Sequence, residues 1–318
     1  MANLLNEASI LLTPTAYNNG SMLAVKPENG DGDFTFSRNS AATRVNAQGL
    51  VENVQILSSN LVTNGDFSQE GAEQVTAFTN GTTYPFSTFT SLDNNITSAI
   101  INSNFAGCVS NSISVTSSQT YKVSFNYTKN SGDNLRVVFS SSVSGAGSQT
   151  SNSELVSTSG SITLYLTISS SGTSYLQLGT SSGSASIDFS ITNISVKEVG
   201  QNWTLNNGTA IAEDKATIIG DGSVFGYVEQ LSTFVSGKKY KVTLDAIINS
   251  GGGLKVNYAL GFSDNIGIIT TSGSHTFYYT AGVSGSLIIG RSVGGVAYDS
   301  SITNISILEI TNDTNLPR

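Results

Sequence analysis

An internal repeat constrains the fold of this 318-residue chain more than any other feature of its sequence. Three blocks occur twice and in the same order: 121–124 (Tyr-Lys-Val-Ser) returns at 240–243 (Tyr-Lys-Val-Thr), 135–137 (Leu-Arg-Val) at 254–256 (Leu-Lys-Val), and 191–198 (Ile-Thr-Asn-Ile-Ser-Val-Lys-Glu) at 302–309 (Ile-Thr-Asn-Ile-Ser-Ile-Leu-Glu). The offset is 119 residues for the first two blocks and 111 for the third. We therefore predict two related modules. The first is longer by eight residues, which we place in the Ser/Gly-rich tract between Ser140 and Ser161.

Within each copy, apolar residues alternate with polar ones, which is the pattern of a strand buried on one face. Val123, Phe125 and Tyr127 share a face in the first copy, and Val242 and Leu244 do so in the second. Clusters of Gly, Ser and Asn separate these runs and are typical of tight turns. Because no segment combines helical periodicity with caps, we predict an all-β chain whose modules are sandwiches or jelly rolls.

The residues before the repeat differ from it in composition. Residues 1–58 hold two of the four prolines and both methionines, with strand-like runs at 9–13 and 22–25 around an Asn-Gly turn. Because so short a segment buries little apolar surface by itself, we expect it to need a partner chain or a neighbouring domain to be ordered. The predicted domains are an N-terminal docking or oligomerisation segment, 1–58, and two tandem modules, 59–200 and 201–318.

The charge balance and the reactive residues argue against several functions. The net charge of −8 disfavours broad nucleic-acid binding, and with no run of 18 apolar residues we expect no membrane insertion. The start, 1–12, lacks the basic region of a signal peptide. We predict Cys108 to be a buried hydrophobe and His275 a strand residue. No nucleophile elbow or phosphate-binding glycine motif is present, so we predict no enzyme.

A family likeness appears along both copies, over about residues 59–310. The chain resembles the carbohydrate-binding-module jelly rolls that are appended to xylanases and other glycan-degrading enzymes. The segments that carry the resemblance are the opening strand 61–68 (Leu-Val-Thr-Asn-Gly-Asp-Phe-Ser), the middle strand 121–127, the Trp-bearing segment 202–205, and the closing strands 187–196 and 298–307. The second copy lacks the Asn-Gly-Asp-Phe opening. The resemblance implies two tandem jelly-roll β-sandwich modules.

Sugar binding requires exposed aromatic rings that stack on pyranose faces, beside polar groups that bond the hydroxyls. The candidate carbohydrate-binding residues are Tyr84, Phe86, Trp203, Tyr227 and Tyr258. The alternative is that these large rings fill the cores of the two sandwiches.

The same resemblance implies a structural calcium ion between the opening and closing strands of such a module. Carboxylates and backbone carbonyls suit this ion. The matching carboxylates are Asp66 and Asp188 in the first copy and Asp299 in the second. The alternative is that these acids bond turn amides. Calcium is the only cofactor that we expect.

The N-terminal segment carries a second likeness. Residues 32–52 (Gly-Asp-Phe-Thr-Phe-Ser-Arg-Asn-Ser-Ala-Ala-Thr-Arg-Val-Asn-Ala-Gln-Gly-Leu-Val-Glu) resemble a recurring leader of bacteriophage structural proteins, of the tail-fibre or head-fibre kind. In those proteins the leader precedes variable jelly-roll modules. The resemblance implies a virion location, other virion proteins as partners, a homotrimer, and docking through Phe34, Phe36, Arg38 and Arg44.

Together these patterns predict a structural virion surface protein, a fibre or a decoration, which displays two modules. Attachment to host-surface polysaccharide is a further expected role. A dedicated receptor-binding adhesin and a glycan-cleaving depolymerase are the alternatives. A depolymerase would need paired carboxylic acids, and no pair is marked out by its surroundings.

Overall fold

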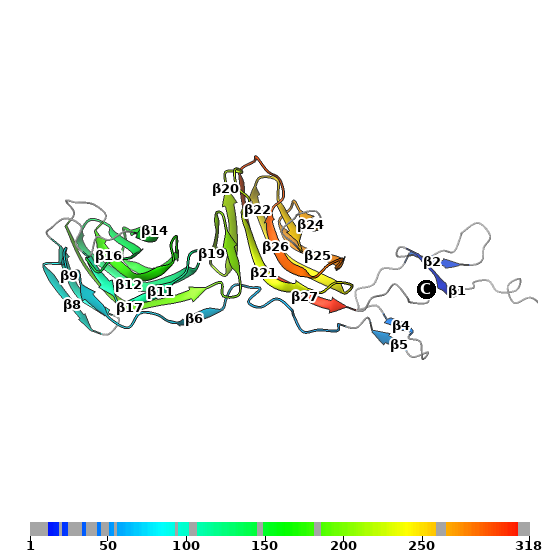
Figure 1. The fold of residues 1–318 in the computed structure, drawn as a ribbon, viewed down its shortest axis with the longest axis horizontal. Coiled ribbons are helices and arrows are strands. Elements are labelled where there is room, and N and C mark those ends of the chain that lie inside the picture. The colour runs from blue at the N-terminus through cyan, green and yellow to red at the C-terminus, as the bar shows by residue number, and fades with distance from the viewer. Residues whose placement is uncertain are drawn as a thin grey trace, which may run out of the picture.

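Every regular element in the described part of the chain is a β-strand, which confirms the all-β prediction. The computed structural model describes residues 12–18, 21–24, 34–35, 43–45, 51–53, 56–92, 95–101, 107–144, 149–180, 186–258 and 265–310. Within these ranges no helix is long and apolar enough to cross a membrane. Figure 1 shows two modules side by side, with β19 and β20 between them.

The first module is a sandwich of two antiparallel sheets. Their strand orders are β14-β13-β16-β10-β7, with β11 against β16, and β15-β12-β17-β9-β8, with β6 against β17. The strands are β6 (Glu70–Glu73), β7 (Phe78–Asn80), β8 (Thr88–Leu92), β9 (Asn95–Ile101), β10 (Gly107–Ser110), β11 (Ile113–Val115), β12 (Thr120–Gly132), β13 (Leu135–Ser140), β14 (Gln149–Val156), β15 (Gly160–Thr167), β16 (Gly172–Thr180) and β17 (Ile187–Val199).

The second module repeats this sandwich over five strands of each sheet, and β6 and β11 have no separate counterpart among its described strands. Its sheets have the orders β18-β21-β26-β23-β24 and β19-β20-β27-β22-β25. The strands are β18 (Thr204–Asn206), β19 (Thr209–Ala212), β20 (Lys215–Gly220), β21 (Tyr227–Phe234), β22 (Lys239–Ser250), β23 (Leu254–Asn257), β24 (Asn265–Ile269), β25 (Gly273–Thr280), β26 (Gly285–Arg291) and β27 (Tyr298–Ile310). Two tandem jelly-roll β-sandwich modules are therefore present, as predicted.

The longer loop of the first module is divided between two places. β13 and β23 begin at Leu135 and Leu254, β15 and β25 at Gly160 and Gly273, and β17 and β27 at Ile187 and Tyr298. The offset thus falls from 119 to 113 and then to 111. Six of the eight extra residues lie between the starts of β13 and β15, which agrees with the predicted tract. The other two lie within β16, which has nine residues where β26 has seven, and the repeated blocks gave no marker there.

The alternating residues form one core in each module, as their spacing predicts. Val123, Phe125 and Tyr127 of β12 lie in the first core, and Val242 and Leu244 of β22 lie in the second. Burying a side chain of this size contributes about 1.5–3 kcal/mol to stability. Cys108 is also buried in the first core, where burial raises the pKa of its thiol, so it is the inert hydrophobe that the sequence suggested.

The N-terminal segment contains two small sheets in its described residues. One has the order β1-β2-β3, from Leu12–Asn18, Ser21–Ala24 and Phe34–Thr35, and the other pairs β4 (Thr43–Val45) with β5 (Val51–Asn53). The β1–β2 hairpin agrees with the hairpin expected around the Asn-Gly turn.

Residues 56–67, which we call the second opener, lie against the second module although they precede the first in sequence. Leu61 N donates to Ile307 O at 2.9 Å, and Ile305 N donates to Gly65 O at 2.9 Å. The side chains of Val62 and Phe67 belong to the second core. The closing strand β27 therefore gains this segment as a neighbour.

Residues 70–75, the first opener, make the equivalent contacts in the first module. Gln74 N donates to Val196 O at 2.9 Å, and Val196 corresponds to Ile307 at the offset of 111. Glu73 Oε1 accepts from the backbone N–H groups of Val75 (3.3 Å) and Val196 (2.7 Å). In the second opener, Asn60 Oδ1 accepts in the same way from Val62 (3.1 Å) and Ile307 (3.0 Å).

These contacts change the predicted domain organisation. The sequence placed 61–68 at the start of the first module and left the second without an opening strand, whereas the structure gives this segment to the second module. The first module, 70–199, is thus inserted between the opener and the body of the second (Figure 1). The physical reason is that the two closing strands offer almost identical edges, so the local sequence does not say which edge an opener joins.

Candidate functional site

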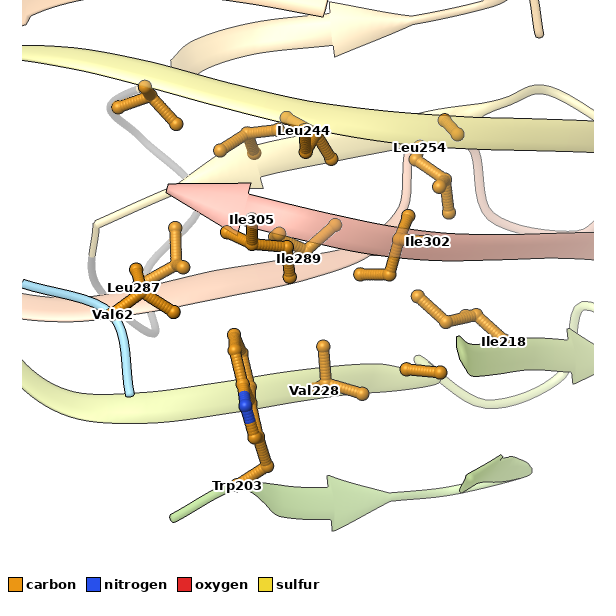
Figure 2. Packing of buried hydrophobic residues seen from close by; sticks show 14 of the residues in the cluster. Val62, Trp203, Ile218, Val228, Leu244, Leu254, Leu287, Ile289, Ile302 and Ile305 are labelled. Atoms are coloured by element: carbon orange, nitrogen blue, oxygen red, sulfur yellow. The ribbon is translucent and has the colours of Figure 1, made fainter. Parts of the chain in front are cut away.

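Trp203, a predicted sugar-binding residue, is a core residue of the second module. Its side chain is 8% exposed, its ring lies 5.1 Å from that of Phe67, and its Nε1–H donates to Asn64 O at 2.9 Å. Figure 2 shows the ring pointing inward toward Val62 and Val228. Trp203 therefore fixes the second opener to the body of its module, and little of its side chain reaches the surface.

Two of the other predicted aromatic residues are also buried. Tyr258 lies in the second core, with its ring 5.2 Å from that of Tyr279. Phe86 lies in the first core, with its ring 5.7 Å from that of Phe189. Both positions agree with the alternative prediction, in which large aromatic rings fill the cores of the two sandwiches.

Tyr227 and Tyr84 are more accessible, but they lie in different modules. Tyr227 is half-buried on β21, 5.2 Å from the ring of Phe225, and burial raises the pKa of its hydroxyl. Tyr84 is 39% exposed in the loop between β7 and β8. The predicted aromatic residues thus do not form a single platform.

The three predicted calcium carboxylates are also separate, and each has a donor from the protein. Asp66 accepts from Ser68 Oγ at 2.8 Å, and Ser68 lowers the pKa of Asp66. Asp188 accepts from Asn130 Nδ2 at 3.0 Å. In the described residues no three His, Cys, Asp or Glu side chains gather as a metal site. The expected pairing of Asp66 with Asp188 is not seen, because Asp66 lies in the second opener. A calcium ion stays a prediction.

The repeat includes a side-chain hydrogen bond, which Asp299 makes in the second module. Asp299 accepts from Asn249 Nδ2 at 3.1 Å, which matches the bond from Asn130 to Asp188 in the first module. Two modules with the same acid–amide bond between the same two strands support the alternative reading of these acids as structural.

The side chains of the four predicted docking residues lie outside the described part of the structure. Phe34 lies in β3 and Arg44 in β4, but only their backbone is described. Phe36 and Arg38 lie outside the described residues.

A cleft of about 310 Å³ lies where the two modules meet, and we call it the junction cleft. One wall is the turn 116–120, which leads into β12, and the other is 198–205, which joins β17 to β18. The lining combines serine and threonine hydroxyls and the amides of Gln119, Gln201 and Asn202 with the apolar side chains of Val199, Trp203 and Leu205. Glu198 is its only ionisable side chain.

Glu198 is a half-buried carboxylate with a neutral partner. Gln119 Nε2 donates to Glu198 Oε1 at 3.1 Å. Burial raises the pKa of Glu198, and the bond from Gln119 opposes this shift. The nearby cations, Lys122 and Lys197, bind Glu70 instead, at 2.6 and 2.9 Å. The charge of Glu198 is therefore poorly compensated within the cleft.

The amides of the cleft are held in fixed orientations. Gln119 Oε1 accepts from Thr116 N at 2.6 Å, which directs its NH₂ group toward Glu198. Gln201 Nε2 donates to Glu198 O at 2.7 Å, and its Oε1 is buried without a partner. Gly71 of the first opener lies behind them, where a Cβ would come within 2.8 Å of Gln201 Nε2. Glu198 is thus the acceptor of the cleft that has unused capacity.

The sequence contained a signal for this site that motif searching missed. Glu198 corresponds to Glu309 within a repeated block, and Gln119 corresponds to Lys238 at the offset of 119. The acid at the equivalent position thus faces a neutral residue, Gln119, in the first module and a cation, Lys238, in the second. Only the structure shows that these residues face each other.

Comparisons with known proteins give weak likenesses. No protein-family model matches the sequence, and no curated protein matches it. Among solved structures, the N-terminal CBM22-1-CBM22-2 tandem domain of Xyn10C from Paenibacillus barcinonensis is similar over 76% of this chain and 100% of that chain, with 10% identity and a TM-score of 0.24. A fucolectin from striped bass (Morone saxatilis) serum is similar over 68% and 86%, with 9% identity and a TM-score of 0.23. The fold assignment therefore rests on the strand order itself.

Proposed function

We propose that this chain is a glycan-binding protein and that the junction cleft holds a sugar unit. The observation that carries the proposal is the lining of the cleft, where Glu198, Gln119 and Gln201 present a carboxylate and fixed amides beside hydroxyl side chains. Such planar polar groups pair with the alternating donors and acceptors of sugar hydroxyls. The volume of about 310 Å³ lies at the lower end of small-ligand sites.

The test is a glycan array followed by calorimetry on the best ligand. Replacing both Gln119 and Gln201 with Ala is expected to weaken binding by tenfold or more, since each lost bond to a sugar hydroxyl costs about 0.5–1.5 kcal/mol. The matched control is Lys238→Ala at the equivalent turn of the second module, with unchanged affinity. An array without hits, or equal binding by the double variant, would refute the proposal.

The proposal is binding without cleavage. Glycosidases usually place two carboxyl groups on either side of the scissile bond, and the junction cleft has Glu198 alone among its ionisable side chains. Incubation with the polysaccharide that the array identifies is expected to leave its chain length unchanged. Shortened products on size-exclusion chromatography would favour the depolymerase alternative.

We also propose that residues 1–55 dock the protein to a virus particle. The likeness of 32–52 to a phage leader supports this role. The second opener begins at Ile56, which bridges to Ile310 at the end of β27, and Leu57 N donates to Glu309 O at 2.8 Å. A deletion that tests docking must therefore stop at residue 55 if it is to leave the second module intact.

Deletion of 1–55 is expected to keep the melting temperatures of both modules and to abolish incorporation into particles. Mass photometry is expected to show a trimer for the full chain and a monomer for the shortened one. The control is deletion of 1–67, which also removes the second opener and should lower the stability of the second module. Particles that still carry the 1–55 deletion, or a trimer that survives it, would contradict this role.

A further inference from the structure

The turn that carries Gln119 has a close counterpart in the second module. Two backbone hydrogen bonds hold both turns alike: Ser118 N to Ile168 O (2.8 Å) matches Gly237 N to Ala281 O (2.7 Å), and Ile168 N to Gln119 O (2.8 Å) matches Ala281 N to Lys238 O (2.9 Å). Ser118 and Gly237 both have a positive φ, of 73° and 80°. The side chains at 119 and 238 therefore start from the same backbone position.

The partner of the conserved acid differs between these two sites. In the second module, Lys238 Nζ lies 2.7 Å from Glu309 Oε2. In the first, Gln119 stands in place of the lysine, while Glu198 keeps the position of the acid. An amide is a weaker partner for a carboxylate than an ammonium group, and a half-buried carboxylate without a cation is costly. The first module thus has the anion of this pair without its cation.

The surroundings of Glu198 offer a place for a cation from outside. The lining of the junction cleft contains no Lys or Arg. Tyr121, the neighbour of Glu198 across the β12–β17 pair, contributes a neutral hydroxyl whose pKa is raised to about 12 by burial and by Glu198. Gln201 Oε1 is buried from solvent and does not reach the open space, so Glu198 is the acceptor that the cleft offers to a cation. A half-buried carboxylate beside hydroxyl side chains suits a group that has several N–H donors and a positive charge.

We propose that the junction cleft takes a glycan unit with a free amino group, whose ammonium binds Glu198 as Lys238 Nζ binds Glu309 in the second module. This inference rests on the proposed glycan binding and adds the class of sugar, an amino sugar that is not N-acetylated. The second module binds no such unit at the equivalent turn, because Lys238 already occupies the position beside its acid.

The test compares two ligands that differ only at the nitrogen. The full-length protein is titrated calorimetrically, near pH 6, with glucosamine oligomers and with N-acetylglucosamine oligomers of equal length. We expect the glucosamine oligomers to bind at least about tenfold more tightly, because hydrogen bonds to charged groups are stronger than those between neutral groups. Glu198→Gln is expected to remove this preference, so that the two kinds of oligomer bind the variant with equal affinity.

A second variant tests the inference from the opposite direction. Gln119→Lys introduces into the first module the cation of the second, and it is expected to abolish the preference for glucosamine without lowering the melting temperature. Lys238→Gln and Glu309→Gln are the matched controls, and both should keep the preference. Equal loss in Glu309→Gln, which changes the net charge as Glu198→Gln does, would mean that net charge, rather than the cleft, attracts the oligomers.

The outcomes separate the inference from the proposed function. Equal affinity for the two oligomers, or a preference that survives Glu198→Gln, overturns the amino-sugar inference and leaves glycan binding standing. Binding of neither oligomer, with no other hit on the array, overturns both. A lysine-containing peptide that binds as tightly as the glucosamine oligomer would show that the cleft selects amines of proteins rather than sugars, and it would also overturn the inference.

Discussion

Trp203→Ala is expected to destabilise the second module by about 3–5 kcal/mol, because removal of a large buried ring leaves a cavity that the structure fills only in part. The ring packs on Phe67, and its N–H group satisfies the carbonyl of Asn64, so the variant also leaves that acceptor without its donor. Both contacts join the opener to the body of the module. The loss should therefore include detachment of the second opener.

The measurement is denaturant unfolding followed by far-UV circular dichroism, with labelling of Cys108 as a reporter of the first module. Cys108 is the only cysteine of the chain and is buried in the first core. Its protection should persist at denaturant concentrations that unfold the second module of the variant. Tyr84→Ala, at an exposed position, is the control and should change stability by less than about 0.5 kcal/mol. A stable Trp203→Ala variant that no longer binds glycans would instead identify the ring as a ligand platform.

Gly65→Ala is expected to destabilise the second module by about 1–3 kcal/mol or more, as overpacking does in cores. A Cβ at position 65 would clash with the carbonyl oxygen of Ile305, and this atom is backbone that cannot turn away. The same strand donates from Ile305 N to Gly65 O at 2.9 Å. Relief of the clash therefore requires the opener to move away from β27 and breaks this bond.

The fluorescence of Trp203, the only tryptophan, reports the second module in this experiment, and Cys108 labelling again reports the first. We expect the tryptophan transition to shift and the cysteine transition to stay. The matched control is Gly282→Ala, since no atom lies within 4 Å of a Cβ there. If the cysteine transition shifts instead, the opener belongs to the first module, as the sequence alone suggested, and the inserted arrangement is wrong.

Several features of the fold could be predicted because they depend on local order. Alternation in 121–127 places Val123, Phe125 and Tyr127 on one face whatever the rest of the chain does, since successive side chains of a strand point to opposite faces. The turn between β22 and β23 could be predicted as well, because Asn, Ser and Gly cluster at 249–253 and these residues favour tight turns. Because similar sequences form the same strand order, the strands predicted for one copy of the repeat are also predicted for the other.

The candidate site could not be predicted in the same way, because it is built from residues far apart in sequence. Gln119 and Glu198 are brought to 3.1 Å by the pairing of β12 with β17. The aromatic residues were misleading because sugar platforms and sandwich cores use the same rings. Whether Trp203 faces solvent or Phe67 depends on where the second opener lies.

The sequence by itself determined the strand faces, the turns and the existence of two related modules, since these follow from residue spacing and from repetition. Tertiary structure alone decided which module each opener joins, because β17 and β27 offer similar edges, and long-range contacts such as those of Phe67 with Trp203 and of Gly65 with Ile305 distinguish them. It also decided that Glu198 lies in a cleft without a cation. That property depends on the packing of one module against the other, and no stretch of either module contains it.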